Sequence, residues 1–360
     1  MTALLLALAL RFAQEKPLPE KERVQERVTV DRVVVTGRVI DRFANPISGL
    51  VAGDFRLRVD GRDAAIESVE WIPPRPRSEQ SPIVAKTEAE TPEADVAQKR
   101  PSPAGQATLA APFRTIVMLF QWEIAGQKDT GFLRMMRQAK RLVDSSDSED
   151  RIAVFGYGSS LRLLQDFTTD HAALSDAIEA VRSLSFRGRP ASASGPTLST
   201  TGADCGQTAS IQKAIVCIGK SLQPLPGPKT LLFFGWTIAS RKAPPRVEYR
   251  ELVEVIGKAQ TSVWVLDVSD GKHTLASGLA RLASDTGGLY NGGCIYETMY
   301  CADLIRLKVH RAVESGVYEL VFRDPAFTPG WHQVDITLTG RVGTALFPRW
   351  YRDGPDVSKR

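Results

Sequence analysis

The chain has 360 residues, of which 43% are hydrophobic and 24% are charged, so it can form two or three globular units with ordinary cores. This composition excludes a disordered or fibrous protein. Forty-six Lys and Arg residues against 41 Asp and Glu residues give a net charge of +5, but the basic residues are scattered. Nucleic-acid binding needs a basic footprint on one element and is therefore not expected.

The first 13 residues have the pattern of a secretory signal peptide. Residues 3–10 are apolar, and small residues suited to cleavage follow as far as Ala13, although no Lys or Arg precedes the run. The run is too short to span a bilayer. The alternative is an apolar helix that docks on the fold. Because the next residues are polar and include two prolines, we expect export to the periplasm or the extracellular space, without a transmembrane segment.

Residues 28–72 alternate apolar and polar side chains with a period of two, which predicts the antiparallel strands of a small β-rich domain. Asn-Pro and Asp-Gly pairs provide turns between the runs. Residues 73–112 are rich in Pro, Glu, Ala and Ser and have little apolar content. A segment that cannot bury a core predicts a flexible linker.

Residues 113–300 alternate between continuous apolar runs and segments with helical periodicity. The continuous runs predict buried strands of a parallel sheet, and the periodic segments predict five helices between them. The motif GYGSS at 156–160 predicts a hairpin. The expected fold is a doubly wound, Rossmann-like α/β domain. The four apolar runs lie at 115–120, 152–155, 230–234 and 262–266.

Residues 303–352 return to the strand pattern, with three short runs and turn residues between them. They predict a C-terminal antiparallel β segment. Either this segment pairs with residues 28–72 in one discontinuous domain, or it folds by itself. Both alternatives stay open at the level of the sequence.

Four cysteines lie in two close pairs, Cys205 with Cys217 and Cys294 with Cys301. An even count in an exported chain predicts two short-range disulfides, although four cysteines allow three pairings. Neither pair has the C-x₂₋₄-C spacing of a zinc knuckle, so a zinc site is not expected. Four unpaired buried thiols are the remaining alternative.

Four stretches of sequence carry a resemblance to a known family. They are RVIDRFANPISGLVAGDFRLRVDGR at 38–62, DRIAVFGYGSSLRLLQDFT at 150–168, GPKTLLFF at 227–234 and LARLASDTGGLY at 279–290. In this order and spacing they resemble the von Willebrand factor A-related (VWA-related) family first described in acidobacterial genomes. The resemblance implies an exported protein in which a VWA domain of α/β fold is flanked by small antiparallel β-rich segments.

The resemblance also implies where a metal site would lie. A VWA domain typically binds a divalent cation through a D-x-S-x-S loop, a Thr from a second loop and an Asp from a third. Here the first-loop positions are Gln121, Glu123 and Ala125, within LFQWEIAG. Thr208 matches the Thr position, and the third loop, GWTIAS at 235–240, has no Asp.

One carboxylate and one amide oxygen make a poor cage for Mg²⁺, which prefers an octahedral set of oxygen ligands and dehydrates reluctantly. The sequence therefore predicts a degenerate site without metal, and no other cofactor. Asp204 and Asp267 lie near the same edge of the sheet by strand topology. They are the two carboxylates that would rescue a cation site.

Several of these residues have a plainer interpretation. Gln121 and Glu123 belong either to a solvated loop or to a metal-free recognition surface. Thr208 precedes an apolar-periodic helix and is interpreted as its N-cap. Trp122 and Trp236 on neighbouring loops are typical of binding hot spots, although packing against the β-rich flank explains them equally well.

Catalysis is not expected, because the chain offers few convergent reactive groups. GYGSS lacks the G-x-S-x-G form of a hydrolase elbow, and the polar loop 187–202 lacks the Lys of a phosphate-binding loop. Surface or structural roles are expected for the four histidines, His171, His273, His310 and His332.

The leading hypothesis is an exported protein that binds a protein partner and carries no catalytic residue. The predicted partner-binding residues are Gln121, Trp122, Glu123, Thr208 and Trp236. One alternative is a structural envelope or scaffold protein that uses the VWA fold only for packing. Another is an adhesive domain that depends on Mg²⁺. The sequence predicts neither the identity of the partner nor the oligomeric state.

Overall fold

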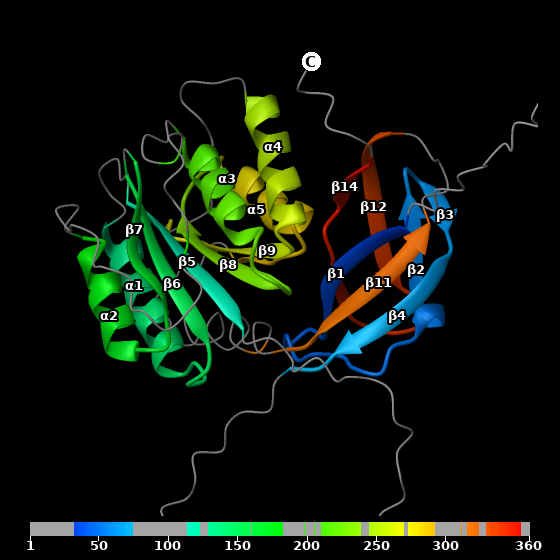
Figure 1. Ribbon diagram of the computed structural model, residues 1–360, viewed down its shortest axis with the longest axis horizontal. Coiled ribbons are helices and arrows are strands. Elements are labelled where there is room, and N and C mark those ends of the chain that lie inside the picture. Colours follow the sequence, from blue (N-terminus) through cyan, green and yellow to red (C-terminus); the bar gives the residue numbers. More distant parts are fainter. Residues whose placement is uncertain are drawn as a thin grey trace, which may run out of the picture. The chain divides into compact units, whose positions relative to one another are not determined.

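The part of the chain that this computed structural model describes contains one mainly parallel β-sheet with helices and two antiparallel β-sheets (Figure 1). The predicted signal peptide, most of the predicted linker, and Glu123, Asp204, Thr208, Cys294 and Cys301 lie outside the described residues. The described residues are 32–74, 114–122, 129–158, 160–182, 198, 205, 210–238, 245–269, 273–291, 311, 315–323 and 329–353.

A six-stranded sheet in the order β10-β9-β8-β5-β6-β7 forms the centre of residues 114–291. Only β6 and β7 pair antiparallel, and they form the hairpin predicted from GYGSS. Every residue of β5 and β8 is buried, which explains why the central strands appear in the sequence as continuous apolar runs. The strands are β5 (Thr115–Gln121), β6 (Arg151–Tyr157), β7 (Leu161–Thr168), β8 (Lys229–Gly235), β9 (Thr261–Asp267) and β10 (Tyr290–Asn291).

Helices cover both faces of this sheet, because each central strand sends alternate side chains to opposite sides. Leu232 and Phe234 of β8 pack with the core beneath α1 and α2, whereas Leu231 and Phe233 pack with the core beneath α3, α4 and α5. The doubly wound α/β fold predicted from the sequence is confirmed. In the described ranges, no helix is long and apolar enough to cross a bilayer. The helices are α1 (Asp129–Asp144), α2 (His171–Ala180), α3 (Ile211–Leu222), α4 (Pro245–Lys258) and α5 (Ala276–Asp285).

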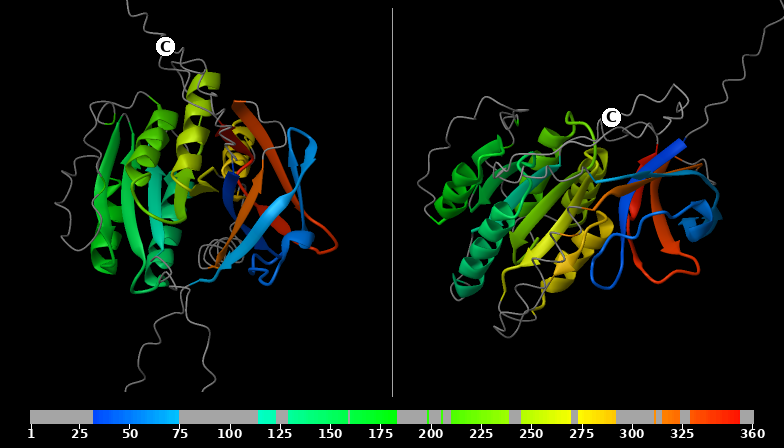
Figure 2. Two further views of the ribbon diagram at one scale, coloured as in Figure 1. Left: turned by 45° about the vertical axis from the view of Figure 1, so that its right-hand side comes forward. Right: turned by 90° about the horizontal axis from the view of Figure 1, so that it is seen from below.

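The N-terminal and C-terminal β segments together form two antiparallel four-stranded sheets, in the orders β13-β1-β11-β4 and β14-β12-β2-β3. N-terminal strands, blue in Figure 1 and Figure 2, alternate with C-terminal strands, orange and red, in the first sheet, and in the second sheet β2 pairs with β12. The two β segments therefore belong to one discontinuous domain, here called the β-sandwich. Its elements are β1 (Arg32–Ile40), η1 (Ala52–Asp54), β2 (Phe55–Val59), β3 (Arg62–Ala64), β4 (Ile66–Ile72), β11 (Val317–Arg323), β12 (Gly330–Leu338), β13 (Thr344–Leu346) and β14 (Trp350–Asp353).

The core of the β-sandwich uses residues from both ends of the chain. Leu57 of β2 and Leu320 of β11 belong to the same buried cluster. The predicted Asp60-Gly61 turn joins β2 to β3, and both residues have positive φ, 49° and 79°. A two-residue hairpin loop of this kind needs positive φ at both central positions, which the Asp-Gly sequence tolerates.

A buried arginine links the β-sandwich to the α/β domain. Arg38 of β1 donates to the hydroxyl of Ser262 at 3.1 Å and to that of Thr230 at 3.4 Å, and its guanidinium lies 6.0 Å from the ring centre of Trp264. Burial, together with the charge of Arg114, lowers the pKa of Arg38 to about 10. Its neighbours are thus hydroxyls and an aromatic face, a combination that strand periodicity does not predict.

A second link joins β14 to α4 and α5. Asp285 accepts hydrogen bonds from the indole nitrogen of Trp350 at 3.2 Å and from the hydroxyl of Tyr249 at 2.7 Å. Arg352 donates through one nitrogen to both carboxylate oxygens of Glu254, at 3.2 and 3.1 Å. These contacts are polar and directional, so they fix one arrangement of β14 on the helices.

Candidate functional site

The carboxyl ends of β5, β6, β8 and β9 meet at one edge of the sheet, here called the carboxyl edge. Gln121 pairs in register with Tyr157, and Gly235 pairs with Asp267. The chain runs from β5 to β6 on one side and later enters β8 on the other side, so the order of strands reverses between β5 and β8. Doubly wound proteins bind their ligands at such a switch point.

Gln121 lies at this switch point, with its side chain inside the protein. It is 2% exposed, and its Oε1 accepts hydrogen bonds from the backbone N–H groups of Trp236 at 3.1 Å and Thr237 at 3.3 Å. The side chain of the first loop therefore holds the start of the third loop. This placement differs from both the solvated loop and the open recognition surface that the sequence suggested for Gln121.

Gly235 ends β8 in a place that has no room for a side chain. A Cβ atom there would lie 2.3 Å from the ring of Phe233 and 2.9 Å from Oε1 of Gln121. Any larger residue, an aspartate included, would require these atoms to move. The family resemblance expects an Asp in this loop, and the close packing explains why Gly235 does not supply one.

The described residues of this edge do not fit a Mg²⁺ ion, which needs several oxygen ligands and carboxylates to offset its charge. The oxygen of Gln121 already accepts from two backbone groups, and Gly235 has no side chain. Among the described residues, no three His, Cys, Asp or Glu side chains gather closely enough to hold a metal ion.

Both tryptophans of the carboxyl edge are half-buried. The backbone N–H of Trp122 donates to the carbonyl of Tyr157 at 2.6 Å, which joins the first loop to the end of β6. Its ring meets Phe132 of α1 edge to face, with ring centres 4.8 Å apart. Trp236 packs against the same core, on the α1 and α2 face. The ring of Trp122 thus packs against a helix of the α/β domain.

Asp267 anchors the end of β9, and sequence reasoning did not foresee its partners. Its Oδ1 accepts from the backbone of Ser269 at 2.9 Å, while its Oδ2 lies 2.7 Å from Nε2 of His273 and 2.8 Å from the hydroxyl of Tyr290. Burial and the nearby carboxylate raise the pKa of Tyr290. Asp267, the described one of the two carboxylates that the sequence offered to rescue a cation site, thus already contacts protein groups. Its position directly after an apolar run, with a histidine six residues later, is the signal that could have indicated this pair.

The N-cap of α3 is Ser210, whose hydroxyl oxygen accepts from the backbone of Lys213 at 3.2 Å and whose hydroxyl donates to Glu248 at 3.0 Å. The prediction that Thr208 is the cap is wrong, because the helix begins two residues further on than that prediction requires. Glu123, Asp204 and Thr208 lie outside the described residues, so the partner-binding roles of Glu123 and Thr208 and the rescuing role of Asp204 stay predictions.

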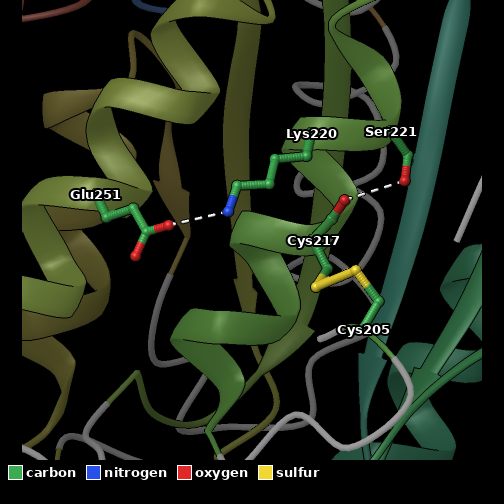
Figure 3. The surroundings of a disulfide bond; sticks show 5 residues. All are labelled: Cys205, Cys217, Lys220, Ser221 and Glu251. Carbon is green, nitrogen blue, oxygen red and sulfur yellow. Dashed lines mark hydrogen bonds and ion pairs between the residues drawn. A yellow bond between two sulfur atoms is a disulfide. The ribbon is translucent and has the colours of Figure 1, made fainter. Parts of the chain in front are cut away.

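The predicted disulfide between Cys205 and Cys217 is present, with the two Cα atoms 5.6 Å apart. Figure 3 shows Cys217 on α3 and Cys205 on the chain that leads toward it. The cysteines of the second predicted disulfide, Cys294 and Cys301, lie outside the described residues.

Comparison with known proteins gives structural neighbours only. No protein-family model matches the chain, and no curated protein matches it. A von Willebrand factor type A protein from Catenulispora acidiphila is 9% identical, with a TM-score of 0.40 over 90% of this chain and 74% of that chain. The conserved hypothetical protein BatB from Bacteroides thetaiotaomicron is 14% identical, with a TM-score of 0.37 over 56% of this chain and 100% of that chain.

Proximal thread matrix protein 1 from the mussel byssus is 15% identical, with a TM-score of 0.37 over 56% of this chain. The match spans about half of the mussel protein, 48% of its length. These likenesses concern the fold alone. The VWA-like fold that the sequence predicts agrees with the strand order and with the helices on both faces of the sheet.

Proposed function

We propose that this chain is an exported, non-enzymatic protein that binds a protein partner at a metal-free carboxyl edge. The observation that carries the proposal is the hydrogen bonding of Gln121 at the switch point. Its amide oxygen accepts hydrogen bonds from the backbone N–H groups of Trp236 and Thr237, so protein groups join the two loops that flank the switch point.

The chemistry of hard cations supports the metal-free part of the proposal. A cation at Gln121 would have to displace two backbone hydrogen bonds. An amide oxygen is neutral, so its attraction for the cation would not offset that loss. Gly235 has no space for a carboxylate that would supply that charge. The edge therefore recognises its partner by shape and apolar contact.

The two tryptophans support the binding part. Trp122 follows β5 and Trp236 follows β8, so they flank the switch point, and each keeps part of its surface exposed. A tryptophan buries about 150–250 Å² in all, of which a partner would cover the part still exposed here, and tryptophan is enriched among the residues that dominate interface energies. Because both rings are already held against the core, little conformational entropy is lost when a partner covers them.

Two features support export. The first 13 residues have the composition of a signal peptide. The disulfide between Cys205 and Cys217 is of a kind that persists in oxidising compartments and is rare in the cytosol.

The proposal is tested with the full chain in two measurements. In calorimetry with Mg²⁺ or Mn²⁺, we expect no submicromolar binding, and such binding would overturn the metal-free edge. In capture from the native host followed by mass spectrometry, Trp122→Ala/Trp236→Ala should lose the captured partner. The matched control is Val342→Ser in the β-sandwich, which is 93% exposed and should retain it.

A second function, a structural protein that uses this fold only for packing, is favoured by the edge-to-face contact of Trp122 with Phe132. In that case the two tryptophans contribute stability alone. The double variant would then unfold at lower urea concentration but would capture the same proteins as the wild type. Loss of capture without loss of stability supports the interaction protein.

A further inference from the structure

Arg38 of β1 reaches the amino ends of β8 and β9, at the edge of the sheet opposite to the carboxyl edge. Its guanidinium donates to the hydroxyls of Ser262 and Thr230, each the second residue of its strand, and these two residues pair in register. Arg38 is 7% exposed, and its Nε is buried without a hydrogen-bond partner in the described structure. A buried donor from which nothing accepts is costly, so this nitrogen indicates a partner other than the described residues.

No described group balances the charge of Arg38. Its contacts are the two hydroxyls and the ring of Trp264, with the guanidinium 6.0 Å from the ring centre. The ring face attracts a cation but has no net charge. Burial and the positive charge of Arg114 both lower the pKa of Arg38, and no described carboxylate raises it. An unpaired charge that is removed from water is expensive, so this arginine needs a negative charge nearby.

Two more cations lie at the same edge. Lys229, the first residue of β8, is 2% exposed and donates to two backbone carbonyls, at 2.7 and 3.0 Å. Arg114 directly precedes β5 and donates to both carboxylate oxygens of Asp150, at 2.5 and 2.7 Å. Of the three cations, Arg114 alone forms an ion pair with a described residue. These side chains together carry more positive than negative charge, which favours an anion at Arg38.

We propose that Arg38 binds a small inorganic anion of the size of chloride at its Nε, between β1 and the amino ends of β8 and β9. The anion accepts the hydrogen bond from Nε and offsets the charge that the neutral contacts leave. Because β1 belongs to the β-sandwich and the two hydroxyls belong to the α/β domain, the bound anion stabilises the junction of the two. The site lies at the opposite edge from Trp122 and Trp236, so it does not depend on the proposed partner.

The close contacts of the guanidinium favour a halide over a larger oxyanion. The hydroxyls of Ser262 and Thr230 lie 3.1 and 3.4 Å from it, and the Nε atom itself is buried. A tetrahedral oxyanion has several oxygens, each of which would need a donor of its own once it is removed from water. A water molecule would accept the hydrogen bond from Nε but would leave the charge of Arg38 as it is.

Urea unfolding of the full chain in increasing sodium chloride tests the site, with sodium gluconate added so that the ionic strength and its screening stay constant. A ligand that binds only the folded state raises the folded-to-unfolded ratio by one plus its concentration over its dissociation constant. Chloride at about 100 times that constant should therefore raise the ratio about 100-fold. Sodium phosphate at the same ionic strength should raise it less.

Arg38→Met removes the charge and the donor, so its urea midpoint should not change with chloride. The matched control is Arg281→Met, which removes an arginine whose side chain is 64% exposed and paired with Asp285. That variant should respond to chloride as the wild type does. The site is refuted if the wild type shows no response at constant ionic strength, or if Arg38→Met responds as strongly as the wild type. A larger response to phosphate than to chloride would refute the assignment to a halide-sized anion.

A second measurement needs no variant, in case Arg38→Met does not fold. Crystals of the wild type grown in sodium bromide should show an anomalous scattering peak within hydrogen-bond distance of Nε of Arg38. A water molecule in that place, with bromide only at exposed side chains, would overturn the proposal. If the bromide peak is present while the variants at Trp122 and Trp236 capture the same proteins as the wild type, the proposed function fails and the anion site stands.

Discussion

Replacing Gln121 with leucine tests whether one buried amide holds two loops together. Leucine is an apolar residue of similar size that removes the side-chain amide, and with it the acceptor oxygen. The backbone N–H groups of Trp236 and Thr237 then lose the oxygen that they contact at 3.1 and 3.3 Å. Because Gln121 is 2% exposed, water has little access to replace it.

The expected cost follows from these two donors. A buried donor left without its partner costs about 1–3 kcal/mol. Thr237 is 6% exposed, so the cost of its unpaired N–H lies toward the upper end of that range. Trp236 is half-buried, so the cost of its N–H lies toward the lower end. We therefore expect Gln121→Leu to lower the free energy of unfolding by about 3 kcal/mol. That is a large part of the 5–15 kcal/mol that stabilises a typical domain.

Gln138 of α1 provides the matched control. It is 7% exposed, and its Oε1 is buried without a hydrogen-bond partner in the described structure. Gln138→Leu makes the same chemical change but removes an acceptor oxygen that makes no hydrogen bond. We expect a free energy of unfolding that is unchanged or about 1 kcal/mol higher. Gln121→Glu keeps an acceptor for the two N–H groups but buries an unpaired carboxylate, so it should also lower the free energy of unfolding at neutral pH.

Urea unfolding followed by circular dichroism and tryptophan fluorescence measures all three variants. Gln121→Leu should lower the midpoint without changing the slope, because the surface exposed on unfolding stays the same. Equal midpoint shifts for Gln121→Leu and Gln138→Leu would refute the reasoning, since the loss would then come from the glutamine-to-leucine change itself and not from the two bonds.

Further predictions concern buried and crowded positions. Burial lowers the pKa of Lys229 to about 8, so between pH 8 and the unfolded value of about 10.5 the unfolded chain binds more protons. The stability of the wild type relative to Lys229→Met should therefore rise by up to about 3 kcal/mol over this range, and a flat difference in urea midpoints would contradict it. Gly288→Ala places a Cβ 1.9 Å from the carbonyl oxygen of Val263 and should cost more than about 3 kcal/mol, or prevent folding. In Gly257→Ala, in α4, the added Cβ meets no atom within 4 Å. The free energy of unfolding should rise by up to about 1 kcal/mol, which a higher thermal midpoint would show.

The central strands were predictable because burial on both faces leaves a continuous apolar run. Their ends were not. The first apolar run of the sequence ends at residue 120 and the third begins at 230, whereas β5 includes Gln121 and β8 includes Lys229. Both polar side chains are 2% exposed and bind backbone groups, Lys229 through the carbonyls of Gly227 and Ala259. A hydropathy pattern counts these side chains as polar and gives no sign of the backbone groups that form hydrogen bonds with them.

Local features of the sequence were predicted better than distant ones. The GYGSS hairpin and the disulfide from Cys205 to Cys217 join residues close in the chain, and both are confirmed. The contacts of Arg38 with Ser262 and of Trp350 with Asp285 depend on how distant segments meet. No single-sequence pattern encodes those meetings. For the candidate site, the position of the edge was predicted, but the burial of Gln121 was not.

The pairing of β1 with β11 has a consequence for the order in which the protein can form. Arg32 and Arg323 lie opposite each other, yet they are about 290 positions apart in the chain, so this pair has a high contact order. The α/β domain is synthesised between the two halves of the β-sandwich and contains all six strands of its own sheet. It can therefore fold first, while β1, β2 and β4 are still without their pairing strands β11 and β12. During that interval the early strands have open edges, which makes the waiting half of the β-sandwich the segment most in need of protection by a chaperone.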